Sequence, residues 1–114
     1  MHARCRGRCK LSRMKSTQPL PKGVSIETVS GGLQRIAVRT ALCEGHVCPH
    51  GAHVTHYQRP GEKPILWMSG KSALEPGKPI RGGVPVCFPW FGARQGHPES
   101  PGHGFVRLME WRLQ

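Results

Sequence analysis

Residues 80–92 read Ile-Arg-Gly-Gly-Val-Pro-Val-Cys-Phe-Pro-Trp-Phe-Gly, a stretch that fits neither a helix nor a regular strand. It is mostly apolar, yet it contains two prolines and three glycines. Proline has no backbone N–H to donate to a sheet ladder, so the segment is not a central strand. Glycine lets the backbone approach another strand or a ligand closely. We therefore expect residues 80–92 to be extended, irregular and tightly packed.

The chain before this stretch has the two-residue periodicity of β-strands. Between Leu33 and Thr40, two apolar residues fall on one face and two arginines on the other, as in a half-buried strand: Ile36 and Val38 against Arg35 and Arg39. Further strands are expected at Val24–Thr28, Ala52–Gln58 and Ile65–Met68, with turns at Ser30-Gly31-Gly32, Glu44-Gly45, Pro60-Gly61 and Pro76-Gly77. No helical periodicity is evident. The sequence predicts an all-β fold, most simply a sandwich.

The segment from His103 to Leu113 also alternates and is interpreted as a strand. Its more apolar face carries His103 and Arg107. A guanidinium in an apolar setting is costly unless it is paired. The partner of Arg107 is therefore either a structural carboxylate or an anionic ligand, and the pattern alone favours neither.

The charge of the 114-residue chain is uneven. Residues 1–22 hold seven of the 17 basic residues and no acidic residue, and much of the formal charge of +11 comes from them. We expect residues 1–22 to form a disordered basic tail and residues 23–114 to form the folded part. Such a tail can also bind nucleic acid or anionic lipid, or act as an organellar leader. Met14 is an alternative translation start.

Compartment and membrane association follow from simple features of the sequence. No stretch of 18 apolar residues is present, so no membrane span is predicted. The basic N-terminus lacks the apolar region of a secretory signal. The five cysteines are an odd number, which favours reduced thiols and a cytoplasmic location.

Three motifs in the last third of the chain resemble the hexose-6-phosphate mutarotase family (glucose-6-phosphate 1-epimerases), which are relatives of the galactose mutarotases. They are the Ile80–Pro85 run, then Pro89-Trp90-Phe91-Gly92, then His103-Gly104-Phe105-Val106-Arg107. Weaker matches are Gly51–Val54, Leu66–Ser69 and Trp111. The matches occur in the family's order and span roughly residues 24–114.

The resemblance implies a galactose-mutarotase-like β-sandwich that interconverts the α and β anomers of an aldohexose 6-phosphate. A base takes the proton of the C1 hydroxyl and an acid protonates the ring oxygen, so that the ring opens and closes again on the other face. The resemblance implies neither a metal nor a cofactor, and neither a nucleic acid nor a membrane as partner. A full-length member is expected to be a monomer.

The family's substrate-binding positions fall on Arg81, His103 and Arg107. The two arginines match residues associated with the substrate phosphate, and two guanidinium groups suit a phosphate dianion. His103 matches a histidine that hydrogen-bonds the sugar. Trp90 and Phe91 are either an apolar wall for the sugar ring or part of the core.

The chain also departs from the family pattern. The family's catalytic histidine and glutamate lie downstream of the last motif and have no counterpart up to Gln114, so no catalytic residue is assigned here. A glutamine found in some members is replaced by Gly102. We expect the chain to be an incomplete, N-terminal part of the sandwich that is inactive alone and prone to aggregation at an open sheet edge.

Three other functions remain open. A carbohydrate-phosphate-binding relative without catalysis would keep the same three residues. A nucleic-acid-binding module is suggested only by the charge, because no binding motif follows the tail. A zinc site would use residues from Cys43, Cys48, His50, His53 and His56, but the spacing matches no compact zinc motif. In a regular strand His53 and His56 point to opposite faces, so they could share an ion only across a bulge, and the simpler interpretation is surface histidines.

Overall fold

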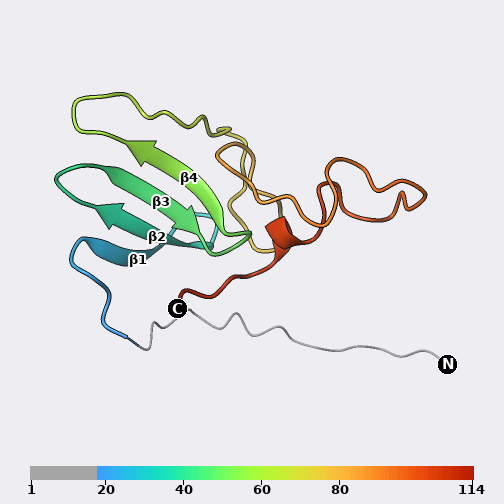
Figure 1. Cartoon of the computed structure of the whole chain (residues 1–114), viewed down its shortest axis with the longest axis horizontal. Helices are drawn as coiled ribbons and strands as arrows, with labels where there is room; N and C mark the ends of the chain where they lie inside the picture. Colours follow the sequence, from blue (N-terminus) through green and yellow to red (C-terminus); the bar gives the residue numbers. More distant parts are fainter. Residues whose placement is uncertain (1–17) are drawn as a thin grey trace.

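The computed structural model describes residues 18–114, and its regular structure is almost entirely β. Four strands and one short 3₁₀ helix follow one another along the chain: β1 (Val24–Thr28), β2 (Gln34–Arg39), β3 (Glu44–Cys48), β4 (His53–Gln58) and η1 (Val106–Leu108). Figure 1 shows the four strands as one sheet, with the irregular second half of the chain gathered beside one end of it. The predicted all-β class is confirmed. Residues 1–17 of the predicted tail lie outside the described residues, and the boundary at residue 22 stays a prediction.

The sheet is an antiparallel meander in the order β1-β2-β3-β4. Strands β1, β2 and β4 lie where the sequence predicts them. The turn expected at Glu44-Gly45 is wrong, because both residues belong to β3. The chain turns just before them, where the Thr40 hydroxyl accepts hydrogen bonds from the N–H groups of Leu42 and Cys43, both at 3.2 Å. A threonine side chain can replace a backbone acceptor in such a turn.

The two faces of β2 alternate as predicted, but the buried face is the one that carries Arg35. Leu33 and Ala37 are 4% and 0% exposed, whereas Ile36 and Val38 are only partly buried. Arg35 is tolerated beside them because its guanidinium pairs with the Glu27 carboxylate at 2.8 Å. A carboxylate on the neighbouring strand therefore offsets the cost of placing a charge near the core.

A β-bulge in β4 overturns the expected placement of two histidines. His46 lies opposite His56 and Cys48 lies opposite His53, with a register shift between these pairs. His46 and Cys48 share one face of β3, so the extra residue, Thr55, brings His53 and His56 to the same face. Strict alternation would have separated them.

The two later strand predictions are wrong. In the segment 65–68 only Met68 forms a bridge, to Gly82, and the side chains of Ile65 and Trp67 are 67% and 73% exposed. The segment 103–113 is interrupted by η1 and has only single bridges at Gly104 and Glu110. Strands need a partner along their length, and the described residues supply none to either segment.

Residues 80–92 are extended and irregular, as predicted, and reach their neighbours through single bridges. Close approach of the glycine backbone is confirmed at Gly83, where a Cβ would lie 2.3 Å from the Val54 carbonyl oxygen. The expected tight packing is wrong for the aromatic side chains, because Phe88 and Phe91 are 62% and 81% exposed.

The hydrophobic core is small and lies on the Leu33 side of the sheet. Leu33, Cys48 and Ile80 form its buried centre, and the partly buried residues packed against them are Val29, Met68 and Leu74. The turns at Pro60-Gly61 and Pro76-Gly77 are confirmed, each closed by a backbone hydrogen bond. Among residues 18–114 no helix is long and apolar enough to cross a membrane.

Candidate functional site

Backbone hydrogen bonds fix the position of Arg81, and its side chain is exposed. Its N–H donates to the Ser72 hydroxyl at 3.1 Å, and its carbonyl accepts from the N–H of Ser69, also at 3.1 Å. The turn from Ser69 to Ser72 therefore holds both backbone groups of Arg81. Within the described part of the chain the guanidinium forms no ion pair with a carboxylate.

Arg107 lies in η1, against the turn between β3 and β4. Gly51 allows this contact, because a Cβ at residue 51 would lie 2.5 Å from the Arg107 carbonyl oxygen. The Nε atom of Arg107 is buried and has no hydrogen-bond partner. The described residues also provide no carboxylate within ion-pair distance of it. A buried, unpaired guanidinium N–H marks a place where an anionic ligand would be stabilised.

His53 attaches β4 to the segment of Arg81. Its Nε2–H donates to the Gly82 carbonyl at 2.6 Å, next to Arg81 in the chain. Burial lowers the pKa of His53, the hydrogen bond to Gly82 opposes this, and the positive charge of Arg107 lowers the pKa further. His53 is therefore hydrogen-bonded to the residue next to Arg81, and its pKa responds to the positive charge of Arg107.

His103 is fixed in one tautomer by the residue at the other end of its loop. Its ring Nδ1 accepts a hydrogen bond from the N–H of Gly92 at 3.0 Å, and the backbone N–H of His103 donates to the Gly92 carbonyl at 2.7 Å. The neutral ring therefore carries its proton on Nε2 and offers a donor to a ligand. Phe91 packs against the ring edge, with 4.7 Å between ring centroids.

Trp90 and Phe91, left open between a sugar wall and the core, do not belong to the buried core. Trp90 is partly buried, donates its indole N–H to the Pro101 carbonyl at 3.0 Å and packs edge-on against Phe105. The guanidinium of Arg94 lies 5.0 Å from the Trp90 ring centroid. Both aromatic residues thus lie beside the His103 loop and outside the buried core.

The predicted surface position of the histidines is wrong for His50 and His53, which are 3% and 1% exposed. Each is satisfied by a backbone carbonyl, since the Nε2–H of His50 donates to Lys78 at 2.9 Å and that of His53 to Gly82. Among residues 18–114 no three side chains of the metal-ligating types converge, so Cys43, Cys48, His50, His53 and His56 are not brought together. In the sequence these histidines stand out only because three of them fall within seven residues, and this spacing does not show that two of them are buried.

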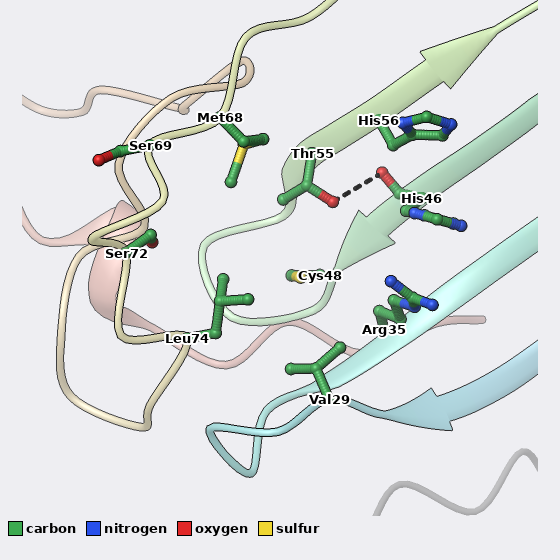
Figure 2. A pocket seen from close by; sticks show the side chains of 10 residues that line it. All are labelled: Val29, Arg35, His46, Cys48, Thr55, His56, Met68, Ser69, Ser72 and Leu74. Carbon is green, nitrogen blue, oxygen red and sulfur yellow. Dashed lines mark hydrogen bonds between the residues drawn. The ribbon is translucent and has the colours of Figure 1, made fainter. Parts of the chain in front are cut away.

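A pocket of about 300 Å³ lies between the sheet and the segment 68–74. Figure 2 shows His56, His46 and Arg35 side by side across three strands, with Met68 and Leu74 facing them. The two imidazole rings stack at 4.7 Å, and burial raises the pKa of the Cys48 thiol below them. Ser72 also lines this pocket, so the pocket adjoins the Arg81 segment, but its lining includes none of Arg81, His103 and Arg107.

The buried histidines predict a loss of stability in mild acid. Burial lowers the pKa of both His46 and His53, so below the ordinary value of 6.5 the unfolded chain binds protons that the folded chain resists. Folding free energy is therefore retained above pH 6.5 and lost as the pH falls, by up to about 1.4 kcal/mol per pH unit for each histidine. Arg39 and Arg35 lower the pKa of Glu27 from 4.5 to about 2. Protonation of this carboxyl therefore causes a separate loss of folding stability as the pH falls from 4.5 to about 2.

Urea unfolding at a series of pH values checks this prediction. The slope of stability against pH between 6.5 and 5.5 should decrease in His53→Gln and decrease further when His46→Gln is added. An unchanged slope in the double variant would show that other groups cause the acid sensitivity.

Comparison with solved structures shows the class of protein that this fold represents. The chain superimposes on the crystal structure of "a putative mutarotase (YeaD)" from Salmonella typhimurium with a TM-score of 0.75 and 34% identity, over 85% of this chain and 32% of that chain. A second structure, HI1317, gives a TM-score of 0.73 at 26% identity, over 84% and 34% of the two chains. The architecture is thus a mutarotase-like β fold.

The family follows from the sequence comparison. The model of the aldose 1-epimerase family matches residues 34–114, and the chain belongs to this family. Two similar proteins share the name "Putative glucose-6-phosphate 1-epimerase". The one from Escherichia coli K12 is 47% identical over 66 residues (56% of this chain, 21% of that protein), and the one from Cenchrus ciliaris is 33% identical over 96 residues (83% and 28%). The chain therefore spans about a fifth to somewhat over a quarter of the length of these relatives.

Proposed function

We propose that this chain supplies the phosphate- and sugar-binding part of a protein that interconverts the α and β anomers of an aldohexose 6-phosphate. The main support is the Arg107 guanidinium, whose buried Nε has no partner and which has no carboxylate beside it in the described part of the chain. A phosphate dianion would accept charge-assisted hydrogen bonds from this guanidinium. Arg81, equally unpaired with a carboxylate, would contribute the second guanidinium.

Within this proposal His103 binds the sugar and does not act as the base. Its Nδ1 is occupied by the N–H of Gly92, so the neutral ring presents an Nε2–H donor toward a sugar oxygen. The reaction moves the C1 hydroxyl proton to a base while an acid protonates the ring oxygen and the C1–O bond breaks. Closure on the other face reverses these steps. We assign the base and the acid to the part of the fold that this chain does not cover.

Two assays test the proposal on the 114-residue chain. Titration should show binding of glucose 6-phosphate but at least tenfold weaker binding of glucose. The rate of α-to-β exchange of glucose 6-phosphate, followed by NMR, should stay at the buffer rate. Equal affinity for both sugars would contradict the phosphate assignment, and acceleration by this chain would contradict the placement of the acid and base elsewhere.

The compartment and assembly state are also proposals. We assign the protein to the cytoplasm, as a monomer when complete. In support, the three cysteines within residues 18–114, Cys43, Cys48 and Cys87, are all free thiols. Secreted domains of this size usually rely on disulfides.

A further inference from the structure

The main chain around Arg81 is hydrogen-bonded at successive peptide units. The Arg81 N–H donates to the Ser72 hydroxyl at 3.1 Å, and the Arg81 carbonyl accepts from the Ser69 N–H, also at 3.1 Å. The next carbonyl, that of Gly82, accepts from the His53 ring at 2.6 Å. Two of these partners are side chains, and they come from different parts of the chain. The backbone of Arg81 is therefore fixed by Ser72 on one side and by His53 on the other.

The His53 ring fits closely against the two glycines of this segment. His53 is 1% exposed, and its Nε2 atom is the donor because a carbonyl can only accept. A Cβ at Gly83 would lie 3.1 Å from this Nε2 atom and 2.3 Å from the Val54 carbonyl oxygen. A Cβ at Gly82 would lie 2.5 Å from the Trp67 carbonyl oxygen. Neighbouring atoms on both sides therefore leave this backbone little room to shift.

A fixed backbone below an exposed side chain is the arrangement of a pre-organised ligand contact. The side chain of Arg81 is exposed, and within residues 18–114 its guanidinium forms no ion pair with a carboxylate. A side chain on a fixed backbone loses less conformational freedom when it binds an anion. We propose that Ser72 and His53 are positioning residues that hold Arg81 for a phosphate group. This inference rests on the proposed function, in which Arg81 contacts phosphate.

Two serines on one loop, shown in Figure 2, provide a matched test. Each hydroxyl accepts one backbone N–H: Ser72 from Arg81 at 3.1 Å, and Ser69 from Lys71 at 3.2 Å. Ser72→Ala removes the contact to Arg81. Ser69→Ala removes an equivalent contact to another residue and keeps the backbone N–H that donates to the Arg81 carbonyl. By isothermal titration, Ser72→Ala should weaken binding of inorganic phosphate and of glucose 6-phosphate about three- to tenfold, and Ser69→Ala less than about twofold.

Histidine variants test the other side of the segment. His53→Leu removes the donor to the Gly82 carbonyl and should lower the same affinities roughly tenfold. His53→Gln keeps an N–H donor on a flexible side chain and should recover part of the loss. Circular dichroism shows whether each variant folds. If His53→Leu does not fold, His53→Gln and Ser72→Ala still test the proposal.

An Arg81→Ala background separates positioning from a general loss of structure. This substitution keeps the backbone N–H and carbonyl to which Ser72 and Ser69 are bonded. Because Ser72 acts through the guanidinium, Ser72→Ala should change phosphate affinity by less than about twofold in this background. Amide hydrogen exchange gives a second measurement that needs no ligand. Exchange at the Arg81 N–H should be faster in Ser72→Ala and unchanged in Ser69→Ala.

Several results would overturn this inference while leaving the proposed function intact, provided that the unsubstituted chain binds phosphate. One is an unchanged affinity in Ser72→Ala, or a loss of the same size in Ser69→Ala. Another is an undiminished effect of Ser72→Ala in the Arg81→Ala background. A third is an Arg81 N–H that exchanges freely in the unsubstituted chain. If the unsubstituted chain did not bind phosphate at all, the proposed function would fail and this inference with it.

Discussion

Gly104→Ala should lower the free energy of unfolding by at least about 3 kcal/mol, because an alanine here meets both a backbone clash and a disfavoured φ. Gly104 has a φ of 78°, and a Cβ on it would lie only 1.9 Å from the carbonyl oxygen of Phe88. The same carbonyl accepts the N–H of Phe105 at 3.0 Å, a hydrogen bond that attaches the segment of His103 and Arg107 to residue 88. Urea unfolding of the variant measures the loss.

Two other glycines separate the causes of this effect. Gly96 has a similar φ of 72° but nothing within 4 Å of its Cβ position, so Gly96→Ala should cost only the backbone strain, about 1–2 kcal/mol. Gly102 has an ordinary φ and a nearest neighbour at 3.8 Å, so Gly102→Ala should be close to neutral. If Gly104→Ala were no worse than Gly96→Ala, the close contact with Phe88 would not exist in solution.

Arg107→Ala should weaken binding of glucose 6-phosphate and of inorganic phosphate roughly 10- to 100-fold, the effect of losing a charged hydrogen-bonded contact. The buried Nε has no protein partner whose loss would add a separate stability cost. Arg107→Lys should recover only part of the affinity, because lysine keeps the charge but not the planar fork of donors. Isothermal titration of the original chain, of Arg107→Ala and of Arg107→Lys with each ligand measures these affinities.

Arg59→Ala provides the matched control for Arg107→Ala. Arg59 is an exposed arginine whose guanidinium pairs with Glu62 at 3.4 Å, away from the candidate site. Its removal lowers the net charge by the same amount, so it should change phosphate affinity less than twofold. An equal loss in both variants would mean that phosphate responds to the overall positive charge and not to a built site.

The strands predicted correctly share one property, which is that their pattern is local. In β2 the alternation of Ile36 and Val38 with charged neighbours lies within six residues, and a glycine turn precedes it. The strand β3 was missed because Glu44-Gly45 is a turn-like pair, and pairing with both β2 and β4 overrides that preference. The alternating segment 103–113 failed for the opposite reason, since η1 interrupts it and only single bridges hold it.

The candidate site was predicted by residue type but not by geometry. The family resemblance predicts Arg81, His103 and Arg107 as substrate-binding residues, and the structure adds that His103 is bonded to Gly92 and that Arg107 has a buried, unpaired Nε. It also adds His53, whose ring is hydrogen-bonded to the carbonyl of Gly82, next to Arg81. A strand histidine carries no sequence signal for this role, because its partner carbonyl lies 29 residues away.

By itself the amino-acid sequence determined the β class, three of the four strands and the glycines at which backbones must approach closely. These features depend on alternation, turn residues and the missing Cβ of glycine, all of which act over a few neighbouring residues. The tertiary structure alone decided which face of the sheet is buried, where the bulge in β4 falls and which arginine lacks a carboxylate. Those outcomes depend on contacts between segments far apart in the chain, and no local pattern encodes the distance between them.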